Sequence, residues 1–296
     1  MTSKKKIKKS QYVLWCILFL FTVLCLLPVL LTLIASFTDE TALSMNGFSF
    51  FPEKWSLESW KYLGKMGDQL IQSYKVTIAM TVIGIISTLL IDSMMAYALS
   101  RTQFKLRGIL SMMLLITMLF SGGQLASYVI NASVYHLKNT FLILCLPMVG
   151  AMDIIIMRTY IQGSIHDALI ESAKIDGAKE FRIYWQIVFP LMKPTLASIG
   201  FMKAVAYWNE WQRGYMYITD SNKYPLQLLL MRIENQIKLL KSDMITAEAA
   251  AALAKNIPST GVRMAMLFTT LGPIMVIYPF FQKYFVKGLT VGSVKG

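Results

Sequence analysis

The stretch that decides the fold reads Glu171-Ser172-Ala173-Lys174-Ile175-Asp176-Gly177 and, nine residues further on, Ile187-Val188-Phe189-Pro190. It is a polar segment between two long apolar runs. Gly177 suits a sharp turn after a short helix, or the close approach of another backbone, because it has no side chain to obstruct either. Pro190 and Pro194 then mark the return into the next apolar run. The stretch therefore predicts a short helix, a turn and a re-entry between two spans.

The composition places this segment in a membrane protein. Hydrophobic residues make up 55% of the 296 residues and charged residues only 15%, which is too apolar for a soluble domain. The net charge of +13 comes from Lys and Arg clustered between apolar runs, without a basic groove that would indicate nucleic acid. All three cysteines lie in apolar runs, which favours packing over disulfides.

Apolar runs long enough to cross a bilayer recur along the chain. A hydrocarbon core of about 30 Å requires roughly 20 apolar residues of helix. The first run follows a lysine-rich start and is interpreted as an uncleaved helix. The template predicts six spans: Val13 to Ala35, Val76 to Leu99, Ile109 to Ile130, Thr140 to Met157, Thr195 to Ile218 and Met264 to Phe281.

The distribution of basic residues orients these spans. Six spans place both termini on one side, and that side carries the larger share of Lys and Arg in its short segments, so both termini are expected to be cytoplasmic. The sequence thus predicts an all-α polytopic membrane protein. Its parts are a tail (1–11), a six-helix transmembrane domain (12–289) with a loop at 158–193 and external loops at 37–74 and 219–263, and a second tail (290–296). In the second external loop, Asp243 suits the N-cap of a helix near 246–254.

The spacing within 171–190 resembles the EAA signature of ABC-importer permeases, which is Glu-Ala-Ala, three residues, Gly, nine residues, Ile, one residue and Leu-Pro. Ser172 for Ala and Phe189 for Leu preserve small size and apolarity. In that family the loop forms a coupling helix that sits in a cleft of the ATPase subunit, so the resemblance implies the type I importer permease fold. An ordinary amphipathic interfacial helix is the alternative. The residues that the resemblance assigns to ATPase coupling are Glu171, Ser172, Ala173, Asp176, Gly177, Ala178, Ile187 and Pro190.

The C-terminal segment 278–296 resembles the end of the shorter permease of maltose-type carbohydrate importers, whose tail reaches into the ATPase dimer. Similarity extends over nearly the whole chain, including Tyr207-Trp208-Asn209-Glu210-Trp211 and Tyr224-Pro225-Leu226-Gln227. It points to the branch that takes up oligosaccharides and polysaccharide fragments. A disordered terminus is the alternative for the tail. The residues implied to contact the ATPase are Thr290, Val291, Gly292 and Lys295.

The resemblance also implies partners. They are a second permease that completes a heterodimer, two ATPase subunits and an extracytoplasmic solute-binding protein that delivers an oligosaccharide, all at a bacterial cytoplasmic membrane. The sequence contains no glycine-rich phosphate loop of the GxxxxGK[ST] kind. We therefore expect ATP and Mg²⁺ to bind the ATPase, and no cofactor on this chain. A permease for an amino acid or another polar solute remains an alternative, since only the tail and the fifth span argue for sugar.

Candidate cargo contacts lie in the fifth span. Aromatic faces, amides and carboxylates bind sugars, and polar groups at membrane depth usually face a cavity. On a continuous helix Asn209 shares a face with Gln212 and Arg213 while Glu210 points elsewhere, which favours Asn209. An interfacial aromatic belt is an equally good alternative. The candidate pathway residues are Tyr207, Trp208, Asn209, Glu210 and Gln212.

Other polar residues within spans predict structural roles. Asp92 and Asp153 have Arg101 and Lys203 as possible partners, which favours pairing over proton relay. The sequence Ser121-Gly122-Gly123-Gln124 interrupts the third span and favours close packing, with local unwinding as the alternative. The two histidines fall on opposite sides of the membrane, so we expect no metal site and no catalytic residue. A membrane-embedded enzyme would need such a cluster.

Overall fold

The computed structural model describes residues 9–240 and 260–290. These residues are mainly helical and contain no strand, only an isolated bridge between Thr38 and Trp55, so the all-α prediction is confirmed for them. The chain divides into two compact units. One comprises Met1–Asp68 and Leu230–Leu271, and the other comprises Gln69–Leu229 and Gly272–Gly296.

The first unit contains α1 (Lys9–Ser36), α2 (Glu40–Asn46) and α3 (Glu58–Lys65). Asp39 caps α2 by accepting a hydrogen bond from the amide of Thr41 at 3.1 Å, and its carboxylate pairs with Lys54 at 3.1 Å. Hydrogen bonds from Thr41 and Lys54 lower the pKa of Asp39 to about 2. The carboxylate of Glu40 accepts from the amides of Thr260 and Gly261 at 2.9 and 3.0 Å, a favourable place for an anion at the start of a helix.

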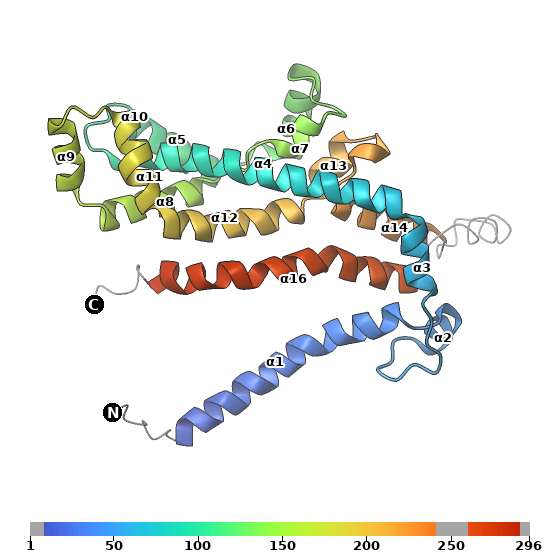
Figure 1. Cartoon of the computed structure of the whole chain (residues 1–296). Helices are drawn as coiled ribbons and strands as arrows, with labels where there is room; N and C mark the ends of the chain where they lie inside the picture. The colour runs from blue at the N-terminus through green and yellow to red at the C-terminus, as the bar shows by residue number, and fades with distance from the viewer. Residues whose placement is uncertain (1–8, 241–259, 291–296) are drawn as a thin grey trace. The chain divides into compact units, whose positions relative to one another are not determined.

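The remaining helices follow in chain order (Figure 1). They are α4 (Gly67–Ser100), α5 (Arg107–Leu119), α6 (Gly123–Val129), the π-helix η1 (Ile130–Val134), α7 (Phe141–Cys145), α8 (Ala151–Ser164), α9 (Asp167–Ile175), α10 (Glu180–Ile183), the π-helix η2 (Tyr184–Val188), α11 (Phe189–Leu191), α12 (Lys193–Trp208), α13 (Gln212–Tyr217), the short helix η3 (Ser221–Lys223), α14 (Leu226–Leu240) and α16 (Thr260–Thr290).

The structure contains fewer long, uninterrupted apolar helices than the apolar runs predict. Among the described residues three helical segments are long and apolar enough to span a membrane: 11–36, 67–100 and 260–277. A fourth results if α5 and the helix at 123–134 count as one span, although they are bent by 117°. The prediction of six spans is therefore not confirmed by the described residues.

The third, fourth and fifth predicted spans are interrupted at 120–122, 146–150 and 209–211. The first break precedes Gly123, whose φ of +76° favours glycine. The second contains Pro147, which has no amide hydrogen to continue a helix. The third break contains neither Gly nor Pro. The apolarity of a segment predicts that it enters the bilayer, but it does not predict where the helix within that segment is interrupted.

Two apolar cores hold the second unit together. One lies toward the Ser100 end of α4, where α8, α12 and the segment 170–192 pack around fully buried Met157 and Ile183. The other lies toward the Gly67 end of α4 and joins it to α7 and α13 through Met80 and Leu144. Figure 1 shows α9 and α10 beside the Ser100 end of α4, and α6, α7 and α13 toward its other half. Each core supports one of the two candidate sites.

Candidate functional site

The first candidate site is the loop at 158–193 with its helix α9, which the sequence predicts to contact an ATPase and which we call the coupling loop. Gly177 follows the end of α9 with φ of +79°, a left-handed conformation that costs other residues free energy. The amide of Gly177 donates to the carbonyl of Lys174 at 3.0 Å, and the amide of Ala178 donates to the carbonyl of Ala173 at 2.9 Å. These two bonds form a Schellman cap that satisfies the last carbonyls of the helix. The predicted turn at Gly177 is thus present.

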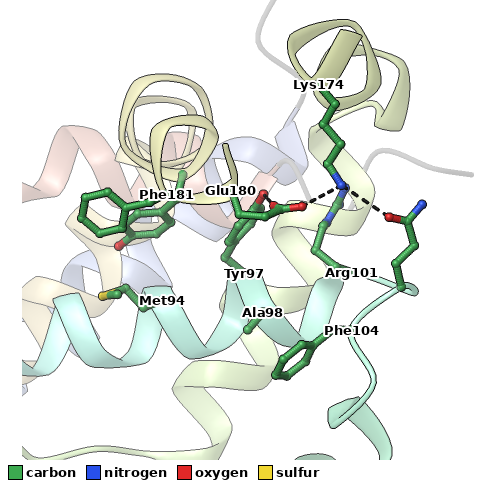
Figure 2. Close-up of a pocket in the computed structure, with 10 residues that line it drawn as sticks. Met94, Tyr97, Ala98, Arg101, Phe104, Lys174, Glu180 and Phe181 are labelled. Carbon is green, nitrogen blue, oxygen red and sulfur yellow. Dashed lines mark hydrogen bonds and ion pairs between the residues drawn. The ribbon is translucent and has the colours of Figure 1, made fainter. Parts of the chain in front are cut away.

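Five polar side chains connect the two ends of α9 with the Ser100 end of α4. Figure 2 shows four of them: Tyr97, Arg101, Lys174 and Glu180. At the start of α9, Arg101 pairs with Asp167 at 3.0 Å. In its last turn, Lys174 pairs with Glu180 of α10 at 2.6 Å, and the hydroxyl of Tyr97 donates to the same carboxylate at 2.5 Å. Because Lys174 and Glu180 lie on either side of Gly177, these contacts fix the direction in which the loop leaves the helix.

The charge on Glu180 is stabilised by these neighbours. Burial alone raises the pKa of this carboxyl, but hydrogen bonds from Lys174 and Tyr97 outweigh it, so that the pKa lies below its ordinary value. A cavity of about 550 Å³ lies between the end of α4 and the loop. Its lining is largely apolar, with Met94, Phe104 and Phe181 beside the charged group of Figure 2. We call it the loop cavity.

The residues assigned to ATPase coupling lie in different surroundings. Ala173, Ala178 and Ile187 are half-buried and pack against the core at the Ser100 end of α4, so they support the loop. Exposed apolar surface is instead supplied by Ile175, which is 86% exposed, and by Leu169. Neither residue belongs to the family signature, but both are apolar residues of the segment that forms α9. The exposed assigned residues are Glu171, Ser172, Asp176, Gly177 and Pro190.

The predicted tail contacts fall at the limit of the described chain. Thr290 is the last residue of α16. Val291, Gly292 and Lys295 lie outside the described residues, as do Asp243 and the helix predicted near 246–254. Their proposed roles stay predictions.

The second candidate site is a cavity of about 430 Å³ to which all three helix breaks contribute. Ser121 comes from the first break, Leu146 and Pro147 from the second, and Glu210 from the third. Hydroxyls, amides, a carboxylate and a guanidinium line it, a mixture that suits a hydroxylated ligand. We call it the break cavity. Its lining residues are Ser121, Gly123, Gln124, Ser127, Asn131, Ile143, Leu146, Pro147, Glu210, Gln212, Arg213, Met216 and Tyr217.

Long side chains of α12 and α13 satisfy the carbonyls that the second break leaves without a helical partner. The carbonyl of Leu146 accepts from the hydroxyl of Tyr207 at 2.9 Å and from the guanidinium of Arg213 at 2.8 Å. The carbonyl of Met148 accepts from the ammonium of Lys203 at 2.6 Å. Irregular backbone is tolerated at membrane depth where it is satisfied within the protein or lines a cavity, and here both conditions hold.

The structure separates the five predicted pathway residues. Glu210 and Gln212 line the break cavity. Tyr207 is fully buried, and Trp208 is buried against Tyr74. Asn209 is exposed and does not line the cavity; its side-chain amide donates to the carbonyl of Val205 at 2.8 Å. The face assignment on a continuous helix therefore fails, because α12 ends at Trp208 and α13 begins only at Gln212.

Several residues that line the break cavity are not among the predicted pathway residues. Arg213 lines the break cavity and also holds its wall through Leu146, while Gln124, Ser127 and Asn131 come from the helix after the first break. The interruption at Ser121-Gly122-Gly123-Gln124 was the available signal. Packing was the favoured interpretation, and the structure instead shows a local unwinding that opens onto a cavity.

The carboxylates within spans have different surroundings. Asp153 pairs with Lys203 at 2.6 Å, and both side chains are largely buried, as the pairing interpretation predicted. Arg101 pairs with Asp167 rather than with Asp92. Asp92 is fully buried near the amide of Gly150, and its carboxylate oxygens accept no well-formed hydrogen bond from the residues that the structure describes. No group of three or more His, Cys, Asp or Glu side chains suited to a metal occurs in 9–240 or 260–290.

Comparisons with known proteins agree over almost the whole chain. The family model described as "Binding-protein-dependent transport system inner membrane component" matches residues 108–291. The chain is 33% identical over 279 residues to the polygalacturonan/rhamnogalacturonan transport system permease protein YtcP of Bacillus subtilis (strain 168), covering 94% of this chain and 96% of that protein. It is 35% identical over 272 residues to protein LplC of the same organism, covering 92% and 90%.

A solved structure shares the fold. One chain in the crystal structure of a bacterial ABC transporter involved in the import of the acidic polysaccharide alginate matches with a TM-score of 0.76 and 26% sequence identity. The match covers 94% of this chain and 99% of that chain. The agreement therefore extends well beyond the segment 171–190.

Proposed function

Because the chain belongs to the family of binding-protein-dependent transport system inner membrane components, we propose that it is a permease subunit of an ATP-driven oligosaccharide importer. The observation that carries the proposal is the coupling loop, whose family spacing coincides with a capped helix held at both ends by α4. A second permease would complete the pathway. Two ATPase subunits would bind ATP and Mg²⁺, and a solute-binding protein would deliver the cargo outside the membrane.

In this proposal α9 is the docking element for an ATPase subunit. Exposed Ile175 and Leu169 supply apolar contact area, and exposed Glu171 supplies a polar contact. The Schellman cap at Gly177 and the pairs of Lys174 and Arg101 keep α9 in a fixed relation to α4. Closure of the ATPases on ATP would thus move the end of α4 together with the loop, and would exchange inward-facing for outward-facing states.

The break cavity is the proposed cargo contact of this subunit. Glu210, Gln212, Gln124 and Asn131 can bond sugar hydroxyls as acceptors or donors, and Tyr217 offers an aromatic face. An oligosaccharide is the proposed cargo class because YtcP and the alginate transporter are described as acting on polysaccharides. A permease for another polar solute would use the same coupling loop. Both termini are proposed to be cytoplasmic, which places the loop on the side of the ATPases.

Transport by the assembled complex tests the proposal. The permease pair, the ATPase and the solute-binding protein would be purified together and reconstituted in vesicles. ATP-dependent uptake of labelled oligogalacturonides and alginate oligosaccharides would then be measured beside an uncharged arabino-oligosaccharide and an amino acid. Uptake of any of the oligosaccharides and not of the amino acid supports the proposal. Uptake of the amino acid alone would contradict the cargo class while leaving the importer mechanism in place.

A further inference from the structure

The hydroxyl of Tyr207 occupies the centre of a hydrogen-bond group that joins three elements. It donates to the carbonyl of Leu146 at 2.9 Å and accepts from the amide of Met148 at 2.9 Å. The hydroxyl of Thr88 on α4 lies 3.0 Å from it. Since a phenol has one proton, and it is used on Leu146, Thr88 must donate to Tyr207. The group is then fully satisfied.

The ring of Tyr207 is fixed as firmly as its hydroxyl. The side chain is fully buried, and it lies so close to α4 that a Cβ added to Gly84 would be 2.3 Å from a ring atom. The amide of Met148 also donates to Thr88 at 3.0 Å, so the second break is bonded directly to α4 as well. Tyr207 therefore faces the backbone of the break and not the cavity that the break lines.

The same α4 carries the contacts to the coupling loop. Ser93 lies 2.7 Å from the hydroxyl of Tyr184 in η2, and Tyr97 donates to Glu180. From Thr88 to Tyr97 is nine residues, or about 14 Å along a helix axis at about 1.5 Å per residue. Because α4 is a continuous helix over this distance, displacement of its Ser100 end is transmitted to Thr88 without an intervening joint.

We infer that Tyr207 is a positioning residue that ties the wall of the break cavity to α4, so that movement of the coupling loop reaches the cargo site through this hydroxyl. The inference rests on the proposed function. Leu146 connects the two sites. Its carbonyl accepts hydrogen bonds from Tyr207 and Arg213, and it lines the break cavity together with Arg213 and Glu210. Shifting α4 therefore shifts the backbone that shapes the cavity.

The test compares the ratio of cargo-stimulated to basal ATP hydrolysis in reconstituted complexes, with oligogalacturonide presented by the solute-binding protein as the probe and the arabino-oligosaccharide as a second probe. Tyr207→Phe keeps the ring against Gly84 and removes only the hydroxyl. Thr88→Val removes the α4 partner and keeps Tyr207. We expect both variants to lower the stimulated-to-basal ratio at least threefold. A threefold change corresponds to about 0.65 kcal/mol, which is within the range for the loss of one net hydrogen bond.

Tyr215→Phe is the matched control, because Tyr215 is exposed on α13 and its ring contact with Trp211 survives loss of the hydroxyl. It should retain the wild-type ratio. A merely structural role would lower the melting temperature of Tyr207→Phe and leave its ratio at the wild-type value, which would overturn the inference. If Tyr207→Phe does not assemble, Thr88→Val decides alone by the same criterion. A wild-type complex that responds to no cargo would instead contradict the proposed function.

Discussion

Tyr97 and Glu180, 83 positions apart in the sequence, share a hydrogen bond that links α4 to the far side of the turn at Gly177. Lys174 reaches the same carboxylate from the near side. The bond therefore joins α4 to a loop whose neighbours along the chain are α8 and α12. It gives α4 a direct side-chain contact with the segment that follows α9.

Removing this bond should weaken coupling more than it weakens folding. Tyr97→Phe and Glu180→Gln are each expected to lower cargo-stimulated ATP hydrolysis, and the double variant should be little worse than either alone, with an interaction energy of roughly 0.5–1.5 kcal/mol. The measurement is a double-mutant cycle on the stimulated rate in vesicles. Strictly additive effects would show that the two residues act independently.

The turn at Gly177 requires its backbone conformation and not free space. A Cβ added there meets no atom within 4 Å, but φ is +79°. Gly177→Val should therefore cost about 1–2 kcal/mol at the loop and reduce ATPase association, whereas Gly177→Asn should be milder because Asn tolerates this conformation. Affinity of the permease pair for the ATPase checks this. Gly163→Val, in open space at an ordinary φ, is the control, and an equal loss there would contradict the argument.

Gly84 is required for the opposite reason. Its φ is ordinary, but an added Cβ would overlap the ring of Tyr207. Gly84→Ala should overpack this contact, cost about 1–3 kcal/mol and displace Tyr207 from Leu146 and Met148. Thermal unfolding of the purified complex measures the loss, and Gly108→Ala on α5, where a Cβ meets nothing, supplies the reference. A neutral Gly84→Ala would mean that the ring has room to move.

The pair between Asp153 and Lys203 should behave as a buried ion pair. Lys203→Met leaves the carboxylate of Asp153 and the carbonyl of Met148 without the ammonium, and is expected to cost about 3–5 kcal/mol. Adding Asp153→Asn should recover part of that loss, because it removes the uncompensated charge. The yield and melting temperature of the assembled complex report both changes. No recovery in the double variant would indicate that the pair contributes through Met148 alone.

The lowered pKa of Glu180 predicts a direction of pH dependence. A carboxyl whose pKa is lower in the folded state stabilises that state above its unfolded pKa, and the contribution disappears as the pH falls through the folded value. The difference in melting temperature between wild type and Glu180→Gln should thus be constant near neutral pH and shrink in acid. A difference that grows in acid would mean that the carboxyl is held in its protonated form.

Some features could be predicted from the sequence because they depend on one residue and its neighbours. Gly177 is an example, since its turn needs only a residue free to adopt positive φ. The role of Tyr207 could not, because it depends on Thr88, 119 positions away, and on a break that brings Leu146 within reach. The same holds for Glu210, which lines the break cavity because α12 ends at Trp208 and does not continue as the helix that the sequence predicts. Composition predicted burial in a bilayer, but not where backbone groups leave their helices.

Three interrupted helices contribute to the break cavity, and the residues around it fall into two groups. The second break is held at Leu146 by Tyr207 and Arg213 and at Met148 by Lys203. Gln124 and Gln212 line the cavity without bonding to this break. Substitutions at Gln124 and Gln212 would therefore change the polar groups that the cavity presents, while the donors that hold the second break stay in place.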